Sequence, residues 1–507
     1  MISIIKNTKS IVEQNVDAIV VFVPENFLYE DVQPIAEKYF SALQDLMMKK
    51  KFTGKALSTC VVTGENGSQS VDLVFIGLGK PGKTGAIDIE TYRRAVGRAV
   101  RIAETRNTTS MAFQLPHGAL FNDTAYAVAY HTTTITYIAA YHFNEFITDA
   151  DQKQDTLKQV VFVTDHADAE IVEAMNAGAV VGQSVNQTRH WIDMPPSHLT
   201  PTHLANKAEA IANKHGLKLT IFSENEVRQM GMGGLAGVSR GSDNDCKLVI
   251  LEYTCSKKDA ETIAFVGKGI TFDSGGLSIK PADYMEKMKD DMAGAAAVIN
   301  AIEALAILKP DVNVIAIAPL AENLPSGKAL MPGDIVTFYN GKTAEVRNTD
   351  AEGRLILADA LSYAVKHYKP DAMIDLATLT GACAYALGPF YTGLMSAHDE
   401  FTERVTAAAE SSGDRVWRLP FHDDYKAAIK NPLADICNIG SNRYRAGAIT
   451  AGLFLQNFVE DVPWVHLDIA GTAFDVPDIS YYRFDSATGV GVRLLVDLAM
   501  NWNVKKS

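Results

Sequence analysis

Two stretches of the sequence combine lysines, acidic residues and an arginine at close spacing. The first, 266–297, reads VGKGITFDSGGLSIKPADYMEKMKDDMAGAAA, and the second, 348–361, reads NTDAEGRLILADAL. In each, a polar loop that contains glycine follows an expected strand and leads into an expected helix. Ligands of α/β folds bind at such strand ends. These two stretches are therefore the first candidates for a functional site.

Four acids in these stretches could form one site: Asp273, Asp291, Asp350 and Glu352. If they converged, about four negative charges would meet, and such a cluster is strongly protonated or unstable unless cations neutralise it. Two divalent metal ions would balance it by charge. The alternative is that each acid is a solvated loop carboxylate or a helix cap, which is the usual case for a single exposed acid. Their joint position at strand ends favours the metal site.

The spacing within each stretch suggests how the side chains are presented. Asp350, Glu352 and Arg354 are two residues apart, so in an extended segment all three would face one way. We expect a helix to begin near Gly353. In the first stretch, Lys268 and Asp273 come just after a strand expected at 262–267, Lys280 follows the Gly275-Gly276 turn, and Asp291 opens an alanine-rich helix expected at 292–307.

A different chemistry is suggested by GLGKPGKT, residues 77–84, which has the spacing of a phosphate-binding loop and follows the apolar run 71–76. Such a loop needs a helix that begins at its Gly-Lys-Thr, so that free N–H groups point at the phosphates. Here Gly85 follows, and Asp88 is the better N-cap. We interpret the stretch as a turn, and a nucleotidase that uses Lys83 and Thr84 remains the alternative. A weaker dinucleotide-like match, Gly231–Ala236, follows a helical pattern instead of a strand.

Length and composition indicate an ordinary globular protein of two or three domains. The chain has 507 residues, 47% hydrophobic content and a formal net charge of −13, so nucleic acid is not expected as its main partner. Five cysteines without C-x-x-C spacing argue against a disulfide framework and fit a reducing cytoplasm. The N-terminal apolar run is too short for a signal peptide, and the apolar stretch 125–143 carries histidines and threonines. We therefore expect no membrane span.

Strand-like and helix-like segments alternate along the chain, which predicts an α/β fold: a smaller N-terminal domain, 1–165, a connector helix, 166–196, and a larger C-terminal domain, 197–507, with a mixed central sheet. Asn340-Gly341 predicts a hairpin with a type I′ turn. The expected N-terminal elements are strands 18–23, 59–63, 71–76 and 159–164 and a helix over 88–106, and the later strands are 248–253, 262–267, 313–318, 373–377 and 464–469.

The stretch 348–361 resembles the signature of the leucyl aminopeptidase, or cytosol aminopeptidase, family (peptidase family M17). The resemblance covers most of 180–500, and the N-terminal third is less similar. Further stretches that resemble the family's landmarks, in the same order, are VGKGITFDSGGLSIKP, ENLPSGKALMPGD (322–334), DLATLTGAC (375–383) and HLDIAGTA (466–473).

The resemblance implies a two-metal exopeptidase that removes amino acids, leucine and other apolar residues above all, from peptides with a free N-terminus. By this resemblance Lys268, Asp273, Asp291 and Glu352 hold a tightly bound metal, and Asp273, Asp350 and Glu352 hold a more exchangeable one. Lys280 and Arg354 match the two catalytic positions, and a bicarbonate beside Arg354 acts as base in the family. The substrate-binding residues would be Met288, Thr378, Leu379 and Gly381, although methionine is also a common filler of cores.

Cofactors and partners follow from the same resemblance. Zinc and manganese are the favoured metals, with magnesium or cobalt as alternatives, because the amine of Lys268 favours a transition metal while carboxylates accept all four. The family forms hexamers, so a homo-hexamer in the cytoplasm is expected. A second alternative to a peptidase is a metal-binding scaffold that has lost turnover. Intact Lys280 and Arg354 argue against it.

Overall fold

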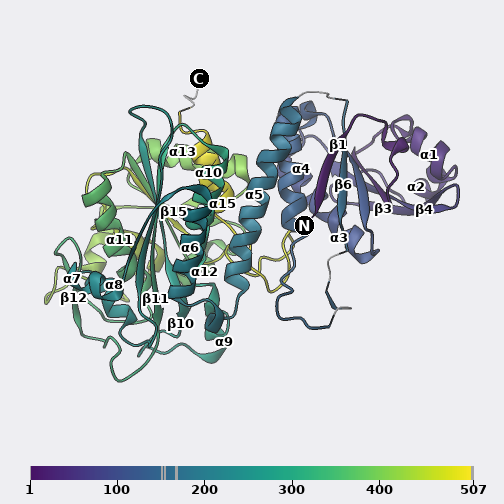
Figure 1. Ribbon diagram of the computed structural model, residues 1–507. Coiled ribbons are helices and arrows are strands. Elements are labelled where there is room, and N and C mark those ends of the chain that lie inside the picture. The colour runs from purple at the N-terminus through teal and green to yellow at the C-terminus, as the bar shows by residue number, and fades with distance from the viewer. Residues whose placement is uncertain (1, 150–151, 154–155, 166–168, 504–507) are drawn as a thin grey trace. The chain divides into compact units, whose positions relative to one another are not determined.

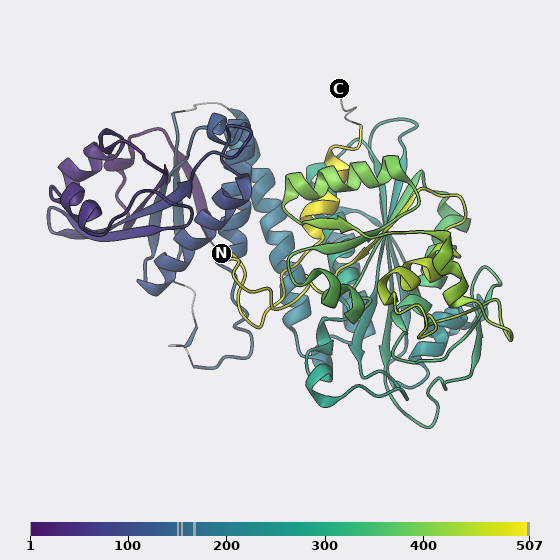
Figure 2. The same ribbon diagram turned by 180° about the vertical axis from the view of Figure 1, so that it is seen from behind.

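The computed structural model of the chain describes residues 2–149, 152–153, 156–165 and 169–503. It divides into two compact units, drawn in Figures 1 and 2. Unit 1 consists of Met1–Asn186 with Asp478–Arg483, and unit 2 of Gln187–Pro477 with Phe484–Ser507. Both are α/β layers, which confirms the predicted fold class.

Unit 1 is built on a six-stranded sheet in which every neighbouring pair is parallel except the edge pair β3–β4. The middle strand β2 is buried along almost its whole length, because helices cover both faces of a parallel sheet. All four strands expected in this region are present. In sheet order the strands are β1 (Ser3–Asn7), β6 (Gln159–Val163), β5 (Ser110–Gln114), β2 (Ala18–Pro24), β4 (Gln69–Gly79) and β3 (Thr59–Asn66).

Helix α3 (Ile89–Thr105) begins where the sequence predicts. The carboxylate of Asp88 accepts a hydrogen bond from the backbone N–H of Glu90 at 3.1 Å and so caps the helix. The predicted connector corresponds to helix α5 (Ala169–Asp193), which runs from unit 1 into unit 2, while 166–168 lie outside the described residues. The other helices of unit 1 are α1 (Gln33–Tyr39), α2 (Leu43–Lys49) and α4 (Ala125–Ala139).

Unit 2 contains a nine-stranded mixed sheet. Its four central strands are parallel to one another, whereas β8, β7 and β15 join antiparallel to their inner neighbours. In sheet order the strands are β16 (Val416–Arg418), β15 (Thr392–Met395), β18 (Trp464–Asp468), β14 (Ala372–Ala377), β9 (Thr262–Gly267), β11 (Asn313–Asn323), β8 (Lys247–Tyr253) and β7 (Lys218–Phe222), with β10 (Gly269–Asp273) beside β11.

Helices cover this sheet in two groups. The group around α10 (Ala293–Leu308) packs on β9, β11 and β14, and the group around α11 (Gly353–Tyr368) packs on β9 and β11 and encloses the large apolar core. Helices α6 (Pro201–His215), α13 (Asp399–Ser412) and α15 (Val492–Met500) belong to the first group, and α8 (Gly233–Ser239) and α14 (Gly447–Gln456) to the second.

The predicted hairpin exists, but its turn is of another type. Strands β12 (Ile335–Thr337) and β13 (Thr343–Glu345) pair antiparallel, and β17 (Ile436–Cys437) extends this small sheet. A type I′ turn needs positive φ at both central residues. Of Asn340 and Gly341 only the glycine has it, with φ +87°. Its N–H donates to the carbonyl of Phe338 at 2.8 Å, so a type I turn is followed by a left-handed glycine. The type I′ prediction was wrong.

One helical run, Ala282–Leu308, is long and apolar enough to cross a membrane by length and composition. However, 78% of its most apolar window is buried inside the structure, where α10 lies against the sheet. This run is therefore a core helix of unit 2.

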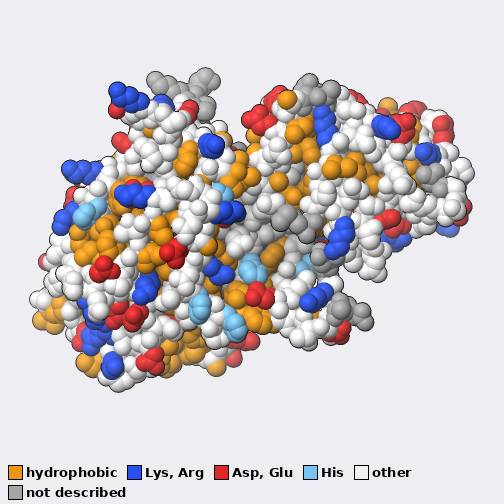
Figure 3. All heavy atoms as spheres, viewed as in Figure 1, with side chains coloured by type: hydrophobic (Ala, Val, Ile, Leu, Met, Phe, Trp, Pro, Cys, Tyr) orange, Lys and Arg blue, Asp and Glu red, His pale blue; other side chains and the backbone are white. Residues whose placement is uncertain are grey.

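Charges of both signs are distributed over the surface. Figure 3 shows acidic and basic side chains interspersed on the face drawn there.

Candidate active site

The site forms at the carboxyl ends of the four parallel strands of unit 2, which all meet at one edge of the sheet. Lys268 directly follows β9, and Asn323 is the last residue of β11. Thr378 directly follows β14, and Asp468 ends β18. Residues far apart in the sequence are thereby brought to one place.

Lys268 forms the buried end of the site. Its Nζ donates to Asp291 Oδ1 at 2.7 Å and to the carbonyl of Thr378 at 2.8 Å, and it lies 2.9 Å from Glu352 Oε1. Burial alone would lower the pKa of Lys268, but the charges of Asp291 and Glu352 outweigh it and raise the pKa. A Cβ on Gly353 would lie 2.7 Å from Nζ, so the approach of this lysine requires glycine there.

Lys280 neutralises the other end. Its Nζ lies 2.8 Å from Asp273 Oδ2 and also pairs with Asp350 Oδ1. The opposite oxygen of Asp273 accepts from Asn323 Nδ2 and from the backbone N–H of Gly275, both at 2.8 Å. Gly275 has φ +85°, and a Cβ there would lie 2.9 Å from Asp350 Oδ1. The glycine thus permits the turn that brings these acids together.

The crowding of acids shifts their pKa values. Burial, and then repulsion by Glu352, raise the pKa of Asp273 to about 7. Burial also raises the pKa of Asp291 and that of Asp350. Burial would raise the pKa of Glu352 as well, but the charges of Lys268 and Lys280 outweigh it and lower that pKa. Two lysines therefore do not fully compensate four carboxylates.

The donor atoms fit divalent cations. Asp273, Asp350 and Glu352 each present an oxygen within 4.8 Å of the others. Two further buried oxygens, Asp291 Oδ2 and Glu352 Oε2, have no hydrogen-bond partner. Unpaired buried carboxylate oxygens are costly in a stable core, and hard divalent cations prefer such ligands. The five predicted metal-binding residues therefore lie together, with oxygens free to bind a cation.

Arg354 is placed differently from the expectation. The segment is not extended: Asp350 lies in a turn and Glu352 has helical backbone angles as the N-cap of α11. The condition for a shared face of 350, 352 and 354, an extended segment, is therefore not met, whereas α11 begins at Gly353 as expected. Arg354 is buried and donates from Nη1 to the carbonyl of Asn438 at 2.7 Å, while its Nε has no partner. Burial lowers the pKa of Arg354 to about 10.

The predicted substrate-binding residues lie around the same edge. Thr378 joins the cluster directly, because its hydroxyl donates to Asp291 Oδ1 at 2.8 Å. The N–H of Leu379 donates to Asp468 Oδ1 at 3.2 Å, and Gly381 is the exposed first residue of α12 (Gly381–Leu387). Met288 is half-buried, three residues before Asp291, in a short 3₁₀ helix.

Three residues that support the site were missed from the sequence. Asn323 holds Asp273, as described above. The side-chain oxygen of Asn438 accepts from the N–H of Arg347 at 2.8 Å and thereby orders the loop before Asp350. Asp468 holds the backbone of Leu379 and the hydroxyl of Thr380, the latter at 2.6 Å. Asn323 and Asp468 lie within the stretches 322–334 and 466–473, but amides and carboxylates that hold backbone leave no spacing pattern.

The phosphate-loop stretch in unit 1 lacks a phosphate site. The N–H of Gly82 donates to the carbonyl of Ala86 at 2.8 Å and the N–H of Gly85 to the carbonyl of Gly82 at 3.1 Å. Helix α3 begins only after Asp88, and Lys83 is exposed. Two of the N–H groups of this loop are thus used within the turn, and no helix begins at its Gly-Lys-Thr.

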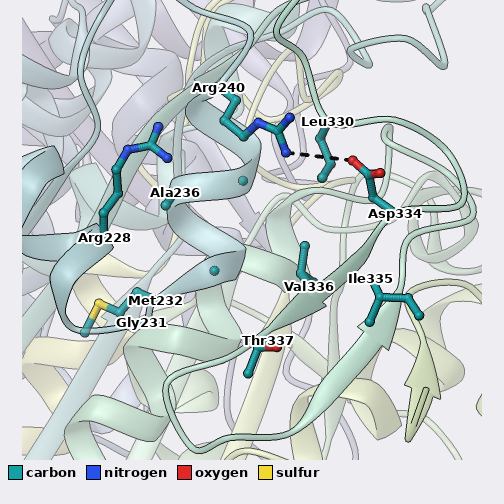
Figure 4. Close-up of a pocket in the computed structure, with 12 residues that line it drawn as sticks. Arg228, Gly231, Met232, Ala236, Arg240, Leu330, Asp334, Ile335, Val336 and Thr337 are labelled. Atoms are coloured by element: carbon teal, nitrogen blue, oxygen red, sulfur yellow. Dashed lines mark ion pairs between the residues drawn. The ribbon is translucent and has the colours of Figure 1, made fainter.

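The dinucleotide-like stretch 231–236 lines a separate hollow of about 550 Å³ in unit 2, shown in Figure 4. As predicted, a helix precedes it, α7 (Glu224–Gln229), and the first turn of α8 is capped by Asp359, whose Oδ2 accepts from the N–H of Leu235 at 2.8 Å. Arg240 and Asp334 form an ion pair of 3.8 Å across the hollow. None of the predicted site residues lines it.

Comparison with protein families shows which family the chain with this buried cluster belongs to. Residues 186–496 match the catalytic-domain model of the cytosol aminopeptidase family, and 13–150 match its N-terminal-domain model. The chain belongs to the cytosol aminopeptidase family. It is therefore a peptidase of that family, which confirms the resemblance, and the family is metal-dependent.

Curated relatives cover nearly the whole chain. A probable cytosol aminopeptidase of Alkaliphilus oremlandii is 39% identical over 489 residues, 95% of this chain and 96% of the relative. A probable cytosol aminopeptidase of Roseiflexus castenholzii is 40% identical over 466 residues, 91% of this chain and 93% of the relative.

Solved structures agree with this assignment. A mutant of tomato leucine aminopeptidase superposes with a TM-score of 0.88 at 30% identity, covering 99% of this chain and 97% of that one. The bottromycin maturation enzyme BotP in complex with Mn gives a TM-score of 0.84 at 29% identity, covering 96% and 100%.

Proposed function

We propose that this protein is a two-metal aminopeptidase that releases N-terminal leucine and other apolar residues from peptides. The observation that carries the proposal is the cluster of Asp273, Asp291, Asp350 and Glu352, in which buried oxygens of Asp291 and Glu352 have no partner. Lys268, Asp273, Asp291 and Glu352 would hold one ion, and Asp273, Asp350 and Glu352 the other. When bound, the two ions supply Lewis-acid activation of water and of the peptide carbonyl.

The lysines have different roles in this proposal. Lys268 lies among acids at the closed end and would bind as a neutral amine, with its proton displaced on loading. Lys280 stays protonated, because the charges of Asp273 and Glu352 outweigh burial and raise its pKa, and its ammonium would donate to the developing oxyanion. Arg354 offers a planar fork with an unpartnered Nε, suited to a bicarbonate that acts as general base.

Selectivity for a free N-terminus would arise at the buried end. A substrate amine placed beside Asp291 and Thr378 meets an acceptor oxygen there, since Asp291 Oδ2 is unpartnered. An acetylated terminus is an uncharged amide. It offers Asp291 neither the positive charge nor the free lone pair of an amine. Met288, Leu379 and Gly381 would border the first side chain. Zinc or manganese in the sites, a homo-hexameric assembly and a cytoplasmic location complete the proposal.

Hydrolysis of Leu-p-nitroanilide tests it. We expect activity that a chelator abolishes and that added manganese or zinc restores, and no release from N-acetyl-Leu-p-nitroanilide. Equal cleavage of the acetylated and free substrates would contradict amine recognition at Asp291. Chelator-sensitive metal binding without any turnover would instead favour the scaffold alternative.

A further inference from the structure

The hollow beside α8 lies outside the candidate active site and combines charged and apolar walls. One wall is α8, and the facing wall is the edge strand β12 with the loop before it (Figure 4). Concave surfaces that present a few polar groups over an apolar floor are the usual form of small-molecule sites. The apolar residues that line this hollow are Met232, Ala236, Leu330, Ile335 and Val336.

Close packing at both ends of α8 holds this wall in place. A Cβ on Gly234 would lie 2.2 Å from the carbonyl oxygen of Leu355, and a Cβ on Gly241 would lie 1.8 Å from that of Leu324. Glycine permits both approaches, so that backbone lies directly on backbone. The hollow is therefore preformed, and a ligand does not have to order it on binding.

Two charged side chains face each other across the hollow and keep unused hydrogen-bonding capacity. Arg240 Nη1 and Asp334 Oδ2 are 3.8 Å apart, which is beyond hydrogen-bond distance. In the described residues the guanidinium of Arg240 has no hydrogen bond, while Asp334 accepts one from the backbone N–H of Met331 at 3.0 Å. The two side chains are 42% and 28% exposed, so a ligand in the hollow can reach both.

The other cation of the hollow, Arg228, is already bound. Its Nε donates to Glu224 Oε1 at 2.9 Å, and Glu224 lies one turn earlier on α7. Arg240 and Asp334 are therefore the charges that are left for a ligand. This pair complements a zwitterion better than a simple anion or cation, because either of those would meet one repelling charge.

We propose that the hollow is a second ligand site, which binds a free amino acid with an apolar side chain. The α-carboxylate accepts hydrogen bonds from Arg240, the α-ammonium donates to Asp334, and the side chain lies on Leu330 and Val336. Both charged groups of an amino acid are attached to one carbon atom, so a single molecule spans the pair. Amino acids of this class are the products that the proposed function releases, but the inference rests on the hollow and not on that activity.

Calorimetry with L-leucine on the purified protein tests the site. L-leucinol has the amine of leucine but no carboxylate, so in excess it competes for the catalytic cluster and leaves the hollow to leucine. We expect one leucine per chain under these conditions. Arg240→Ala and Asp334→Asn should each weaken leucine binding roughly threefold to tenfold, because each removes a partly exposed charged partner. The kcat and KM for Leu-p-nitroanilide should stay at wild-type values in both variants.

Matched variants and ligands separate the site from the fold. Arg418→Ala removes an arginine outside the hollow whose side chain is 43% exposed and which pairs with Asp399 at 2.6 Å, so it should leave leucine binding unchanged. Arg240→Lys keeps the positive charge and should retain most of the affinity. Glycine lacks the apolar side chain, and 4-methylpentanoate lacks the amine. Both should bind more weakly than leucine.

Each outcome decides for or against the site. Equal leucine binding by the wild type, Arg240→Ala and Asp334→Asn would overturn it, as would no leucine binding in the presence of leucinol. Binding of 4-methylpentanoate as tight as that of leucine would show a carboxylate site and overturn the assignment to an amino acid. A wild type that binds leucine through Arg240 but cleaves no Leu-p-nitroanilide would overturn the proposed function and leave this inference standing.

Discussion

Each unit contains a cluster of charged side chains, half-buried in unit 1 and mostly buried in unit 2, and the two clusters are balanced differently. In unit 1, Glu104 lies 2.6 Å from Arg483 and 3.2 Å from Arg101, and it also hydrogen-bonds His142 at 3.0 Å. Burial alone would raise the pKa of Glu104, but the His142 bond and the two arginine charges outweigh it and lower the pKa. In unit 2, four carboxylates share two lysines, and the pKa of Asp273 is raised to about 7.

This difference teaches how a structural cluster differs from a functional one. The Glu104 cluster has cations enough for its acid, and Arg101 also donates to the carbonyls of Ser480 and Tyr482. It therefore holds the segment 478–483, which lies near the C-terminal end of the sequence but belongs to unit 1. The unit 2 cluster keeps unpaired oxygens in its interior, a cost that a fold tolerates where a ligand compensates it.

The largest effects are expected from the two lysines of the unit 2 cluster. Lys280→Ala should leave about two metal ions per chain and lower turnover roughly a hundredfold or more, because an oxyanion donor is lost. Lys268→Ala should instead lower the metal content towards one, because a ligand is lost. Elemental analysis beside rates of Leu-p-nitroanilide hydrolysis measures both.

The two variants serve as controls for each other, since each removes one lysine from the same cluster of four acids. Circular dichroism establishes that both fold. If Lys280→Ala lost metal while Lys268→Ala kept both ions, the roles proposed for the lysines would be reversed.

A smaller effect, on stability, is expected in the unit 1 cluster. Glu104→Gln should lower the free energy of unfolding by about 1–3 kcal/mol near neutral pH, the usual worth of hydrogen bonds to a charged group. Because the folded-state pKa of Glu104 lies below the unfolded value of about 4.3, its stabilisation is present above that pH and is lost as pH falls through the folded-state pKa. Urea unfolding between pH 3 and 7 should show the gap between wild type and variant closing on the acid side.

Glu209→Gln is the matched control, since Glu209 is exposed on α6 and should change stability little at any pH. A gap for Glu104→Gln that stayed constant down to pH 3 would show that the carboxylate charge is not what stabilises unit 1.

Much of the fold could be predicted from local patterns. Asp88 caps α3 as expected, and the strands appear within a few residues of their predicted bounds, because apolar runs and caps are local signals. The type of turn at Asn340-Gly341 could not be predicted. Both the type I′ turn and the type I turn with a left-handed glycine accept this dipeptide, and the register of β12 and β13 decides between them. Nor could the donation of 478–483 to unit 1, which rests on contacts with residues almost 400 positions away, such as Ser480 with Arg94.

The site was predictable in its residues but not in its arrangement. The family motifs identify Lys268, Asp273, Asp291, Asp350 and Glu352, and the structure brings them together. A shared face through Arg354 would have required an extended segment, but Glu352 has helical backbone angles as the N-cap of α11. Asn323 and Asn438 act through long-range hydrogen bonds, for which one sequence carries no periodic signal.

The smallest effect is expected from Lys83, a lysine in a glycine-rich loop after a strand, as Lys268 and Lys280 are, but outside both clusters. It is exposed, no acid pairs with it in the described residues, and the surrounding N–H groups of Gly82 and Gly85 are already used. Lys83→Ala should therefore leave peptidase rates and unfolding midpoints unchanged, and calorimetry with Mg-ATP should detect no binding to the wild type. Micromolar ATP affinity that this substitution abolished would show that the loop rearranges to bind phosphate. Lys83 would then have a function although no buried acids surround it. The balance of charge within a cluster would no longer distinguish functional from structural charged residues in this protein.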